Sequence, residues 1–380
     1  MAFPGVSINV DNGNLQSEIS VIDGVPALVA TANTVGLIGA VTAVYSLPDA
    51  ISKGFTLAAE PFIYGLLNVY YTELGGSQLL YVMGVAETVT MTDVVTSTNA
   101  SGLVKLLNAQ TSVNLVAVAR KPVAGYAAGA AFLDTDVSAA VTASKTLCQA
   151  RQAKNMPIRI FIEGRVVNEN TANVYSPNTA TNGFASVVLG GTTANGSAAV
   201  TLALARAVKY SAHVKIGSGQ NGALSVSSIY VGTKSIDLRT DMETLHDAGF
   251  ITFHKRPGIA GYFFGRDNMC STDDFNILVH GRVIDKAQRI AAIATTPYIE
   301  DYMRINADGT INENDADYME TLVKTAILSK MSGQISDVNV AIDTTQNIVT
   351  NSTLNIRVSV LPLGYLTWIN ITLGLTTQTV

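Results

Sequence analysis

Alternating apolar and polar residues mark both ends of this 380-residue chain as β-strands. A period of two is typical of strands with one buried face. The apolar members of these runs are Val6, Ile8 and Val10 near the start, and Leu354, Ile356, Val358 and Val360 near the end. An isolated strand or strand pair is marginal in water, and an exposed edge invites pairing with another chain. Because neither run has an obvious partner beside it, the sequence predicts strand exchange between subunits, and therefore a polymer.

Near the C-terminus, a second alternating run follows the run at 354–360. Its apolar members are Ile369, Ile371, Leu373 and Leu375. The segment 361–364, Leu-Pro-Leu-Gly, separates the two runs, and its Pro and Gly indicate a turn. Residues 351–380 are therefore predicted to form a C-terminal β-hairpin or arm.

Charged residues make up only 14% of the chain, against roughly 25% in ordinary soluble domains. No charged residue occurs between Thr171 and Ala205. Two explanations stay open: extensive contact between subunits, where charge is costly to bury, or a neutral surface rich in Thr. The segment from Gly24 to Pro48 also lacks charge, but Pro, Thr, Asn and Gly interrupt it. A buried strand with a loop is therefore favoured there over a membrane-spanning helix.

The charge balance argues against nucleic-acid binding. The net charge is −5, whereas phosphate binding needs clustered Lys and Arg. The one local cluster, His254-Lys255-Arg256, precedes Pro257-Gly258 and is expected to decorate a turn. Cys148 and Cys270 have no metal-binding or disulfide spacing, which favours a reducing compartment.

Helix-like and strand-like segments alternate in the first half of the chain, which predicts parallel strands covered by helices. The expected helices are 58–74, 93–109, 134–154 and 197–210, and the expected strands are 78–83, 113–119, 157–162 and 184–189. The rhythm changes after Gly217. The elements expected there are helices at 273–304 and 314–331, and strands at 336–342, 354–360 and 365–375.

The segment 217–222, Gly-Ser-Gly-Gln-Asn-Gly, matches the dinucleotide-binding pattern GxGxxG. It follows a strand-like segment at 213–216, and Asp237 lies near the distance expected for a ribose contact. However, a phosphate site needs a helix to begin at the loop, and residues 223–231 alternate like a strand. The sequence favours a flexible glycine-rich turn.

Residues 306–311, Asn-Ala-Asp-Gly-Thr-Ile, are similar to part of a calcium loop. In that register Arg304 would be the first ligand and Asp315 the last, so the cation would be poorly caged. A hairpin turn before a helix capped by Asn312 or Asn314 explains the same residues. The histidines lack metal-ligand spacing and no nucleophile motif is present, so no catalytic, cofactor-binding or metal-binding residue is predicted.

Three stretches of the sequence have a distinctive pattern. Residues 249–251 with 261–267 form a strand-like segment ending in the aromatic residue Phe264 and Gly265-Arg266, and a helix-like segment containing Phe275, Arg282, Arg289 and Ile290 follows. Residues 354–375 consist of a strand, a Pro-Gly turn and a final strand. These stretches resemble contractile tail sheath proteins of bacteriophages and related contractile injection systems, and the last carries the strongest likeness. In that family the first element reads aromatic-Gly-x-Arg and often has Trp at the position of Phe264, so this chain lacks the spacer before Arg266.

The resemblance implies a mixed α/β and α+β fold: a multidomain tail-sheath-like subunit with an α/β core and extended N- and C-terminal β-arms exchanged between subunits. The expected domains are an arm at 1–20, an α/β domain at 21–240, an α+β sheath core at 241–350 and the arm at 351–380. The residues expected in inter-subunit strands are Val6, Ile8, Val10, Leu354, Ile356, Val358, Val360, Ile369, Ile371 and Leu373. Segments 11–14 and 343–352 are the expected hinges.

The implied function is structural and non-enzymatic. The subunit would polymerise helically around an inner tail tube protein and contract to drive the tube through a target cell envelope. Its expected partners are other copies of itself, the tube, and baseplate and tail terminator proteins, with no direct nucleic-acid contact and no membrane insertion. It would belong to a virion tail or injection particle assembled in the bacterial host cytoplasm. The alternatives are another self-assembling protein, such as a tube or surface-layer subunit, and a dinucleotide-binding α/β enzyme.

Overall fold

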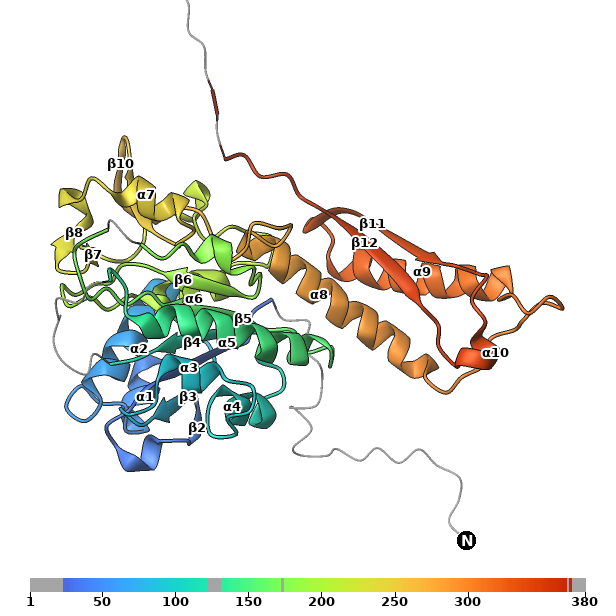
Figure 1. The fold of residues 1–380 in the computed structure, drawn as a ribbon, viewed down its shortest axis with the longest axis horizontal. Coiled ribbons are helices and arrows are strands. Elements are labelled where there is room, and N and C mark those ends of the chain that lie inside the picture. Colours follow the sequence, from blue (N-terminus) through green and yellow to red (C-terminus); the bar gives the residue numbers. More distant parts are fainter. Residues whose placement is uncertain (1–22, 122–130, 172–173, 368, 371–380) are drawn as a thin grey trace, which may run out of the picture. The chain divides into compact units, whose positions relative to one another are not determined.

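The computed structural model describes residues 23–121, 131–171, 174–367 and 369–370 (Figure 1). Its internal contacts divide the chain into a first unit, Met1–Tyr302, and a second unit, Met303–Val380. Each unit is described by itself below. The domain boundaries expected at residues 20, 240 and 350 stay predictions.

A six-stranded sheet in the order β2-β3-β1-β4-β5-β6 forms the centre of the first unit. All of its strand pairs are parallel except β2 with β3. The strands are β1 (Pro26–Thr31), β2 (Val41–Val44), β3 (Leu80–Val85), β4 (Leu115–Ala119), β5 (Arg159–Glu163) and β6 (Ala185–Val188). The residues of β1, β4, β5 and β6 are all buried, which explains why these strands are almost continuously apolar in sequence. The expected parallel α/β layer is confirmed.

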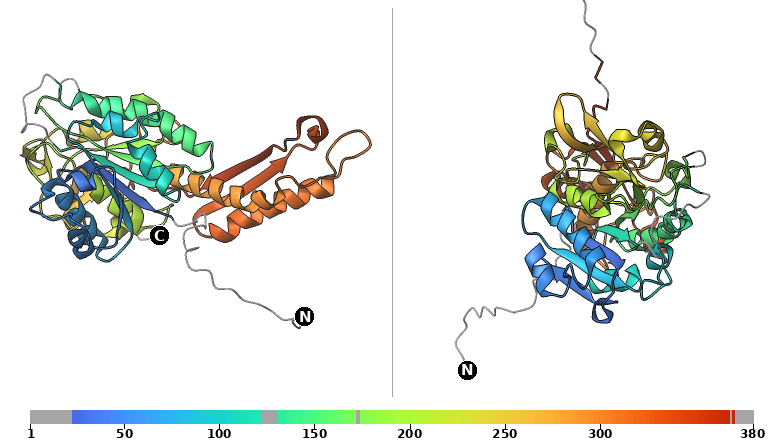
Figure 2. Two further views of the ribbon diagram at one scale, coloured as in Figure 1. Left: turned by 90° about the horizontal axis from the view of Figure 1, so that it is seen from below. Right: turned by 90° about the vertical axis from the view of Figure 1, so that its left-hand side faces the viewer.

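Two groups of helices cover this sheet (Figure 2). Helix α2 (Pro61–Leu74) packs with α6 (Val200–Lys209), and α5 (Thr135–Gln152) packs with α3 (Met91–Val95). Helices α1 (Leu47–Ser52) and α4 (Leu103–Ala109) complete this set. Gly24–Pro48 contains β1 and β2, as expected, and no helix in the described part of the chain is long and apolar enough to cross a membrane.

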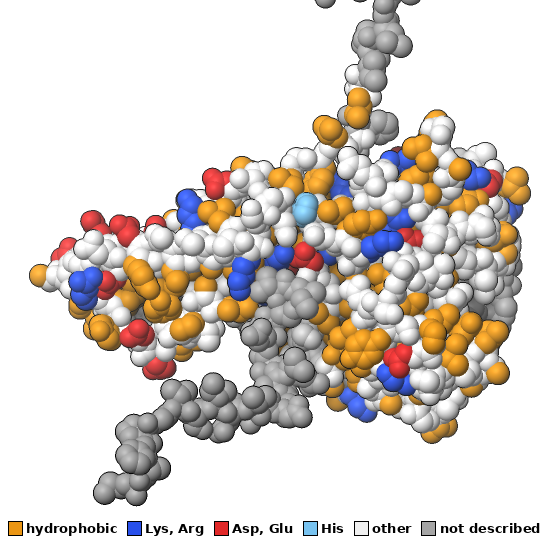
Figure 3. Space-filling view, turned by 180° about the vertical axis from the view of Figure 1, so that it is seen from behind, with side chains coloured by type: hydrophobic (Ala, Val, Ile, Leu, Met, Phe, Trp, Pro, Cys, Tyr) orange, Lys and Arg blue, Asp and Glu red, His pale blue; other side chains and the backbone are white. Residues whose placement is uncertain are grey.

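Helix α6 is buried on every side from Val200 to Val208. Residues 185–188 and 200–205, which contain no charge, are therefore buried inside the first unit. The low charge of these residues reflects neither contact between subunits nor a neutral surface, the two explanations considered from the sequence. Large uncharged areas nevertheless occur on the surface as well (Figure 3).

The prediction of one continuous helix at 93–109 is wrong, because two short helices occupy this segment. Helix α3 ends at Val95, and α4 begins at Leu103. Gly102 explains the break, because a Cβ atom there would lie 2.5 Å from the carbonyl oxygen of Val94. The chain turns back closely on itself at this point, and only glycine leaves room for it.

The rest of the first unit adjoins the β6 edge of the sheet, where Ile251 forms a parallel bridge with Val188. Its elements are β7 (Tyr230–Val231), β8 (Lys234–Ser235), α7 (Met242–Asp247), β9 (Phe253–Arg256), β10 (Ile259–Phe264) and α8 (Leu278–Thr295). Strands β9 and β10 form an antiparallel hairpin, and His254-Lys255-Arg256 precedes its turn as expected. The strand expected at 213–216 is absent, and the helix expected at 273–304 is shorter.

The second unit consists of α9 (Glu313–Lys330), β11 (Ile335–Ile342), α10 (Ile348–Asn351) and β12 (Ile356–Pro362). Strand β12 pairs antiparallel with β11, so the alternating run near the C-terminus has a partner within its own chain. This pairing corrects the expectation that the run lacks one. The second strand expected at 365–375 is not formed at 365–367 or 369–370, and residues 371–375 lie outside the described part of the chain.

A buried ion pair ties α2 to α6. The Glu73 carboxylate contacts the Arg206 guanidinium, and each side chain is at most 3% exposed. Arg206 also donates to the carbonyl oxygen of Ala223 at 2.6 Å, and the backbone N–H of Ser225 donates to Glu73 Oε2 at 2.8 Å. One carboxylate and one guanidinium therefore fix two helices and the loop beside them.

Replacing Glu73 by alanine leaves the Arg206 guanidinium buried without its carboxylate. We expect the free energy of unfolding to fall by about 3–5 kcal/mol, measured by chemical denaturation followed by circular dichroism. Asp49→Asn is the control, because it removes one partner of the solvent-exposed Asp49–Lys53 pair and should change stability little. Similar losses in the two variants would contradict the assignment.

Candidate functional site

The β11–β12 sheet has one apolar face and one polar face. Val338, Val340 and Ile342 of β11 are buried, and they pair in register with Val360, Val358 and Ile356 of β12, which are half-buried. The intervening residues Asn339, Arg357 and Ser359 are exposed. The predicted alternation is therefore confirmed for β12.

Helix α9 covers part of this apolar face. Its buried residues Ala316, Met319, Val323 and Ile327 recur every three or four positions, and α9 packs against β11. Asn312 caps the helix by accepting a hydrogen bond from the Asn314 N–H at 3.1 Å. The small core of the second unit thus consists of one helix and two strands.

Both strands keep an unpaired edge. In the described residues β11 and β12 pair only with each other, so the outer N–H and C=O groups of each strand face no neighbouring strand. Such edges are templates for strand addition. At the end of β11 the Ile342 N–H donates to Glu320 Oε1 at 2.7 Å, so this backbone group is already bound.

The other predicted strand residues divide between exposed and undescribed positions. Leu354 lies just before β12 and is half-buried, and Ile369 is 73% exposed and outside any strand. The remaining five, which lie outside the described residues, are Val6, Ile8, Val10, Ile371 and Leu373. The place of all ten residues in inter-subunit strands stays a prediction.

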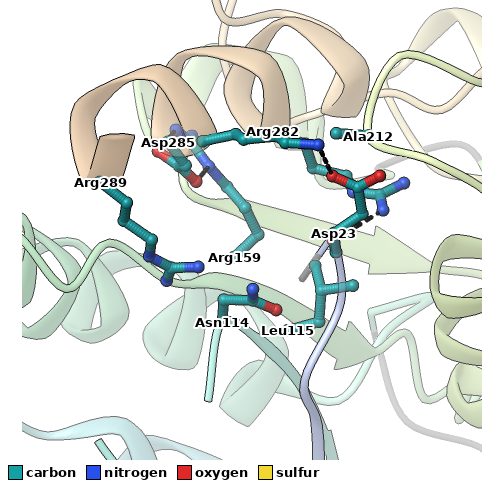
Figure 4. Close-up of a pocket in the computed structure, with 9 residues that line it drawn as sticks. Asp23, Asn114, Leu115, Arg159, Ala212, Arg282, Asp285 and Arg289 are labelled. Carbon is teal, nitrogen blue, oxygen red and sulfur yellow. Dashed lines mark hydrogen bonds and ion pairs between the residues drawn. The ribbon is translucent and has the colours of Figure 1, made fainter. Parts of the chain in front are cut away.

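A cluster of charged side chains lies buried between β5 and α8 in the first unit (Figure 4). Arg159 of β5 makes a two-point ion pair with Asp285 of α8, with both nitrogen–oxygen distances 2.6 Å. The guanidinium also donates to the carbonyl oxygen of Gly183 at 2.5 Å and lies 4.9 Å from the ring centre of Phe184. Arg159 is only 2% exposed. Its charge, hydrogen bonds and ring contact all lie within the protein interior.

The same face of α8 holds the residue with which the described chain begins. Lys286 contacts the carboxylate of Asp23, and Arg282 donates to the Asp23 carbonyl oxygen at 2.9 Å. Arg289, one turn further along, donates to the Pro157 carbonyl oxygen. These contacts fix the point from which the N-terminal segment departs.

The sequence analysis missed this cluster as a site, although it noted Arg282 and Arg289. The missed signal is the spacing of Arg282, Asp285, Lys286 and Arg289, which places four charges on one helix face. Such a face normally points to solvent, whereas here it is buried. The pocket lined by this cluster measures about 20 Å³, space for roughly one water molecule.

The glycine-rich segment at 217–222 does not form a phosphate site. No helix begins after it, as expected, and residues 219–221 form a single 3₁₀ turn. Its carbonyl oxygens face arginines: Arg256 donates to Gly217 O at 2.6 Å and Arg206 to Asn221 O at 3.0 Å. A phosphate loop presents N–H groups to its ligand instead, so this loop is oriented with the opposite polarity.

Open α/β sheets usually bind ligands where the strand order reverses, at the carboxyl ends of the strands. Here that place lies between β1 and β4. Thr31 Oγ1 accepts from the Lys121 N–H at 3.1 Å, and nearby Glu60 accepts from the N–H groups of Asn33 and Thr34. The polar groups described at this position are engaged with the protein's own backbone.

The calcium-like segment at 306–311 is a hairpin turn, as expected. Ile305 and Ile311 form an antiparallel bridge, and Gly309 adopts a left-handed conformation with φ of 85°. The two positions that would be the first and last calcium ligands bind each other, because Arg304 and Asp315 form an ion pair at 2.5 Å. The described residues contain no group of three or more His, Cys, Asp or Glu that could hold a metal.

The two cysteines are buried and unbridged. Burial raises the pKa of both thiols, which keeps them protonated and unreactive. Burial lowers the pKa of His213, whereas the nearby Asp23 carboxylate raises it and the charges of Lys286 and Arg282 lower it.

Gly281 allows Arg159 to reach Asp285. A Cβ atom at Gly281 would lie 2.6 Å from the Arg159 Cζ atom, closer than side chains approach one another. Gly65 is also inside a helix, but a Cβ atom there would meet nothing within 4 Å. The two glycines share a helix setting and differ in the space around them.

We expect Gly65→Ala to stabilise the protein by about 0.5–1 kcal/mol, because alanine favours the helix. Gly281→Ala should instead lower the melting temperature, because the added methyl group displaces the buried guanidinium. Thermal unfolding of the two variants beside the unchanged protein measures these opposite shifts. A stabilising effect of Gly281→Ala would show that the Arg159–Asp285 geometry is not required.

Two family models together cover almost the whole chain. A model described as "DUF2586, N-terminal domain" matches residues 3–268, and one described as "DUF2586, C-terminal domain" matches residues 274–379. No curated protein sequence matches the chain.

The fold is similar to that of solved contractile sheath proteins. The helical sheath of the anti-feeding prophage in its contracted state has a TM-score of 0.63 and 17% identity, with 100% of each chain covered. The contracted PVC sheath, from an extracellular contractile injection system, has a TM-score of 0.62 and 12% identity over 99% of this chain and 98% of that one. The sheath tail protein of Desulfitobacterium hafniense has a TM-score of 0.52 and 13% identity over 94% and 100%. These matches confirm the expected tail-sheath fold.

Proposed function

The chain belongs to the DUF2586 family, and from this membership and its sheath-protein fold we propose that it is the structural subunit of a contractile tail sheath. The observation that carries the proposal is the length of the structural match. It extends over the whole of a sheath subunit and includes the small β11–β12 sheet as well as the large α/β unit. The proposal assigns a structural role and no catalytic residue.

Strand exchange would link the subunits. The second unit offers a two-stranded sheet with two open edges and an apolar face only partly covered by α9. The alternating runs at Val6–Val10 and Ile369–Leu375 have the pattern of strands with one apolar face. Added at the open edges of another subunit, they would satisfy the outer backbone groups and extend its apolar face. Repeated contacts of this heterologous kind produce a helical filament.

Contraction would then be a change in how rigid units pack. The first unit has the buried ion pairs and continuous core of a rigid body. Two alternative arrangements of such bodies store energy without nucleotide hydrolysis, provided that flexible links keep the subunits connected. Segments 11–14 and 343–352 are the proposed links. The first lies outside the described residues, and the second contains the short helix α10.

The partners follow from this role. We assign to the chain other copies of itself, an inner tail tube protein that it surrounds, and baseplate and tail terminator proteins at the two ends of the polymer. Similar chains occur in the baseplate of the anti-feeding prophage, with a TM-score of 0.61. The particle would be a virion tail or an injection system, assembled in the cytoplasm of a bacterial host.

Electron microscopy of the concentrated, purified protein tests the proposal directly. We expect hollow cylinders with a bore wide enough to surround a protein tube, because a sheath must enclose one. Particles that stay monomeric at high concentration would contradict a sheath role. Flat lattices would favour a surface-layer protein instead.

Removing residues 1–15 should abolish cylinder formation and leave a folded monomer, because the N-terminal run can no longer reach a neighbouring sheet. Sedimentation measures the loss of assembly, and circular dichroism checks that the monomer keeps its fold. A second variant of full length replaces Val6, Ile8 and Val10 by Thr, which keeps the strand propensity but removes the apolar face. Cylinders formed by the shortened chain would show that arm exchange is wrong.

A further inference from the structure

The two edges of the β11–β12 sheet differ in how far their backbone groups are already bound. Glu320 Oε1 accepts from the Ile342 N–H at 2.7 Å, and Asp337 Oδ1 accepts from the Val338 N–H at 2.8 Å. Both N–H groups belong to β11. Side chains of the second unit therefore occupy part of the β11 edge.

The outer backbone groups of β12 are those of Ile356, Val358 and Val360. In an antiparallel pair the backbone groups of successive residues point alternately toward the partner strand and away from it. The Ile342 N–H points away from β12, and Ile342 pairs in register with Ile356. In the part of the chain that the structure describes, the outer groups of β12 bind neither a third strand nor a side chain. The β12 edge is therefore the better template for strand addition.

The cation on the exposed face of this sheet also lies on β12. The residues of this face are Asp337, Asn339 and Ala341 of β11 and Arg357, Ser359 and Leu361 of β12. Arg357 forms no ion pair in the described part of the chain. Neighbouring strands lie about 5 Å apart, so a strand added at β12 would be next to Arg357, and one added at β11 would be about 10 Å from its strand. A carboxylate on the incoming strand thus favours β12.

Of the two alternating runs available for exchange, the N-terminal run brings such a carboxylate. Asp11 directly follows the run Val6–Val10 and is the first acidic or basic residue of the sequence. It continues the polar positions Ser7 and Asn9. The run at 369–375 contains no charged residue. The N-terminal run is therefore complementary in charge to the exposed face of β12.

The apolar pattern fits the same register. If the incoming run is antiparallel to β12 and Asp11 lies opposite Arg357, its apolar residues lie opposite apolar ones: Val10 opposite Val358, Ile8 opposite Val360 and Val6 opposite Pro362. A parallel run with the same charge pair would extend past the start of β12 at Ile356 and lose most of its pairing. A shift by one residue would turn the apolar side chains to the polar face.

We propose that residues 6–11 of a second copy add to the β12 edge, antiparallel to β12, with Asp11 beside Arg357. The proposal rests on the sheath function for its partner and adds the edge, the direction and the register to the strand exchange. The apolar alternation selects the face, and the charge pair selects the position along the strand. Arg357 is thereby a residue that determines which of the two runs binds at β12.

Engineered cysteines in the full-length protein test which edge is used. Asn9→Cys places a thiol in the N-terminal run, and Ser359→Cys places one on β12. Asn339→Cys is the matched control, because Asn339 pairs in register with Ser359, is exposed on the same face and belongs to β11. The thiol at position 9 should lie one strand away from position 359 and two strands away from position 339.

The single variants are mixed in pairs, allowed to assemble and then oxidised, so that any disulfide between two variants joins two copies. We expect dimers linked between positions 9 and 359, identified by mass spectrometry of peptides. Linkage between positions 9 and 339 should be about tenfold weaker, because a disulfide needs Cβ atoms about 3.5–4.5 Å apart. The unchanged protein should give no dimer, since Cys148 and Cys270 are buried.

Each outcome of the cross-linking decides one question. Predominant linkage to position 339 would place the run at β11 and overturn the proposal. Hollow cylinders without either linkage would also overturn it and leave the sheath function standing. Linkage to position 359 in particles that have no bore would support the contact and count against the sheath function.

A charge exchange tests the register. Arg357→Asp and Asp11→Arg should each raise the protein concentration needed for assembly by about threefold, because like charges opposite each other destabilise a strand pair. Combining the two changes should restore assembly. Glu18→Arg is the matched control, because Glu18 is the next carboxylate of the N-terminal segment and lies outside the alternating run.

The control variant should not restore assembly when it is combined with Arg357→Asp. Circular dichroism checks that every variant keeps its fold, and sedimentation measures the concentration needed for assembly. Restoration by Glu18→Arg as complete as by Asp11→Arg would overturn the register, because it would show only a general effect of charge.

Discussion

The ion pair between Arg159 and Asp285 is the contact on which the first unit depends. It joins a central strand of the sheet to a long helix that is far away in sequence, and both partners are buried. A buried pair of this kind stabilises little compared with an apolar pair of the same shape, but losing either partner is costly. Its main effect is therefore to select one position of α8 on the sheet. The carbonyl groups of Gly183 and Gly281 select that position further, because they accept from the same guanidinium.

The position of α8 in turn fixes the start of the described chain. Arg282 and Lys286 are one turn or less from Asp285, and both bind Asp23. The root of the N-terminal segment is thus held to the same helix as the sheet. In the proposed strand exchange, the segment before Asp23 would therefore start from a fixed point on the first unit. The sheet edges at which a strand would be added belong to the second unit.

The sequence predicted the α/β layer well because buried parallel strands leave a simple signal. Apolar runs such as Leu115–Ala119 match both helix and strand, but their short length and the helices between them resolve the ambiguity. It predicted β12 but not its partner, because alternation shows which face is buried and does not show which strand lies alongside. The charged face of α8 was missed for a different reason. Arg282, Asp285, Lys286 and Arg289 look solvent-exposed in sequence, and only the arrival of Arg159 and Asp23 from distant segments explains their burial.

The two units solve the problem of unsatisfied backbone groups in opposite ways. In the first unit the β2 edge is protected by Lys53 and the β6 edge by the segment around Ile251. In the second unit β11 and β12 pair only with each other among the described residues, and one side-chain contact at the β11 edge is that of the Ile342 N–H with Glu320 Oε1 at 2.7 Å. A protein that blocked all four edges would be a stable monomer, and one that left all four open would aggregate without order. In the proposed sheath, strand addition would therefore take place at the small sheet and not at the large one.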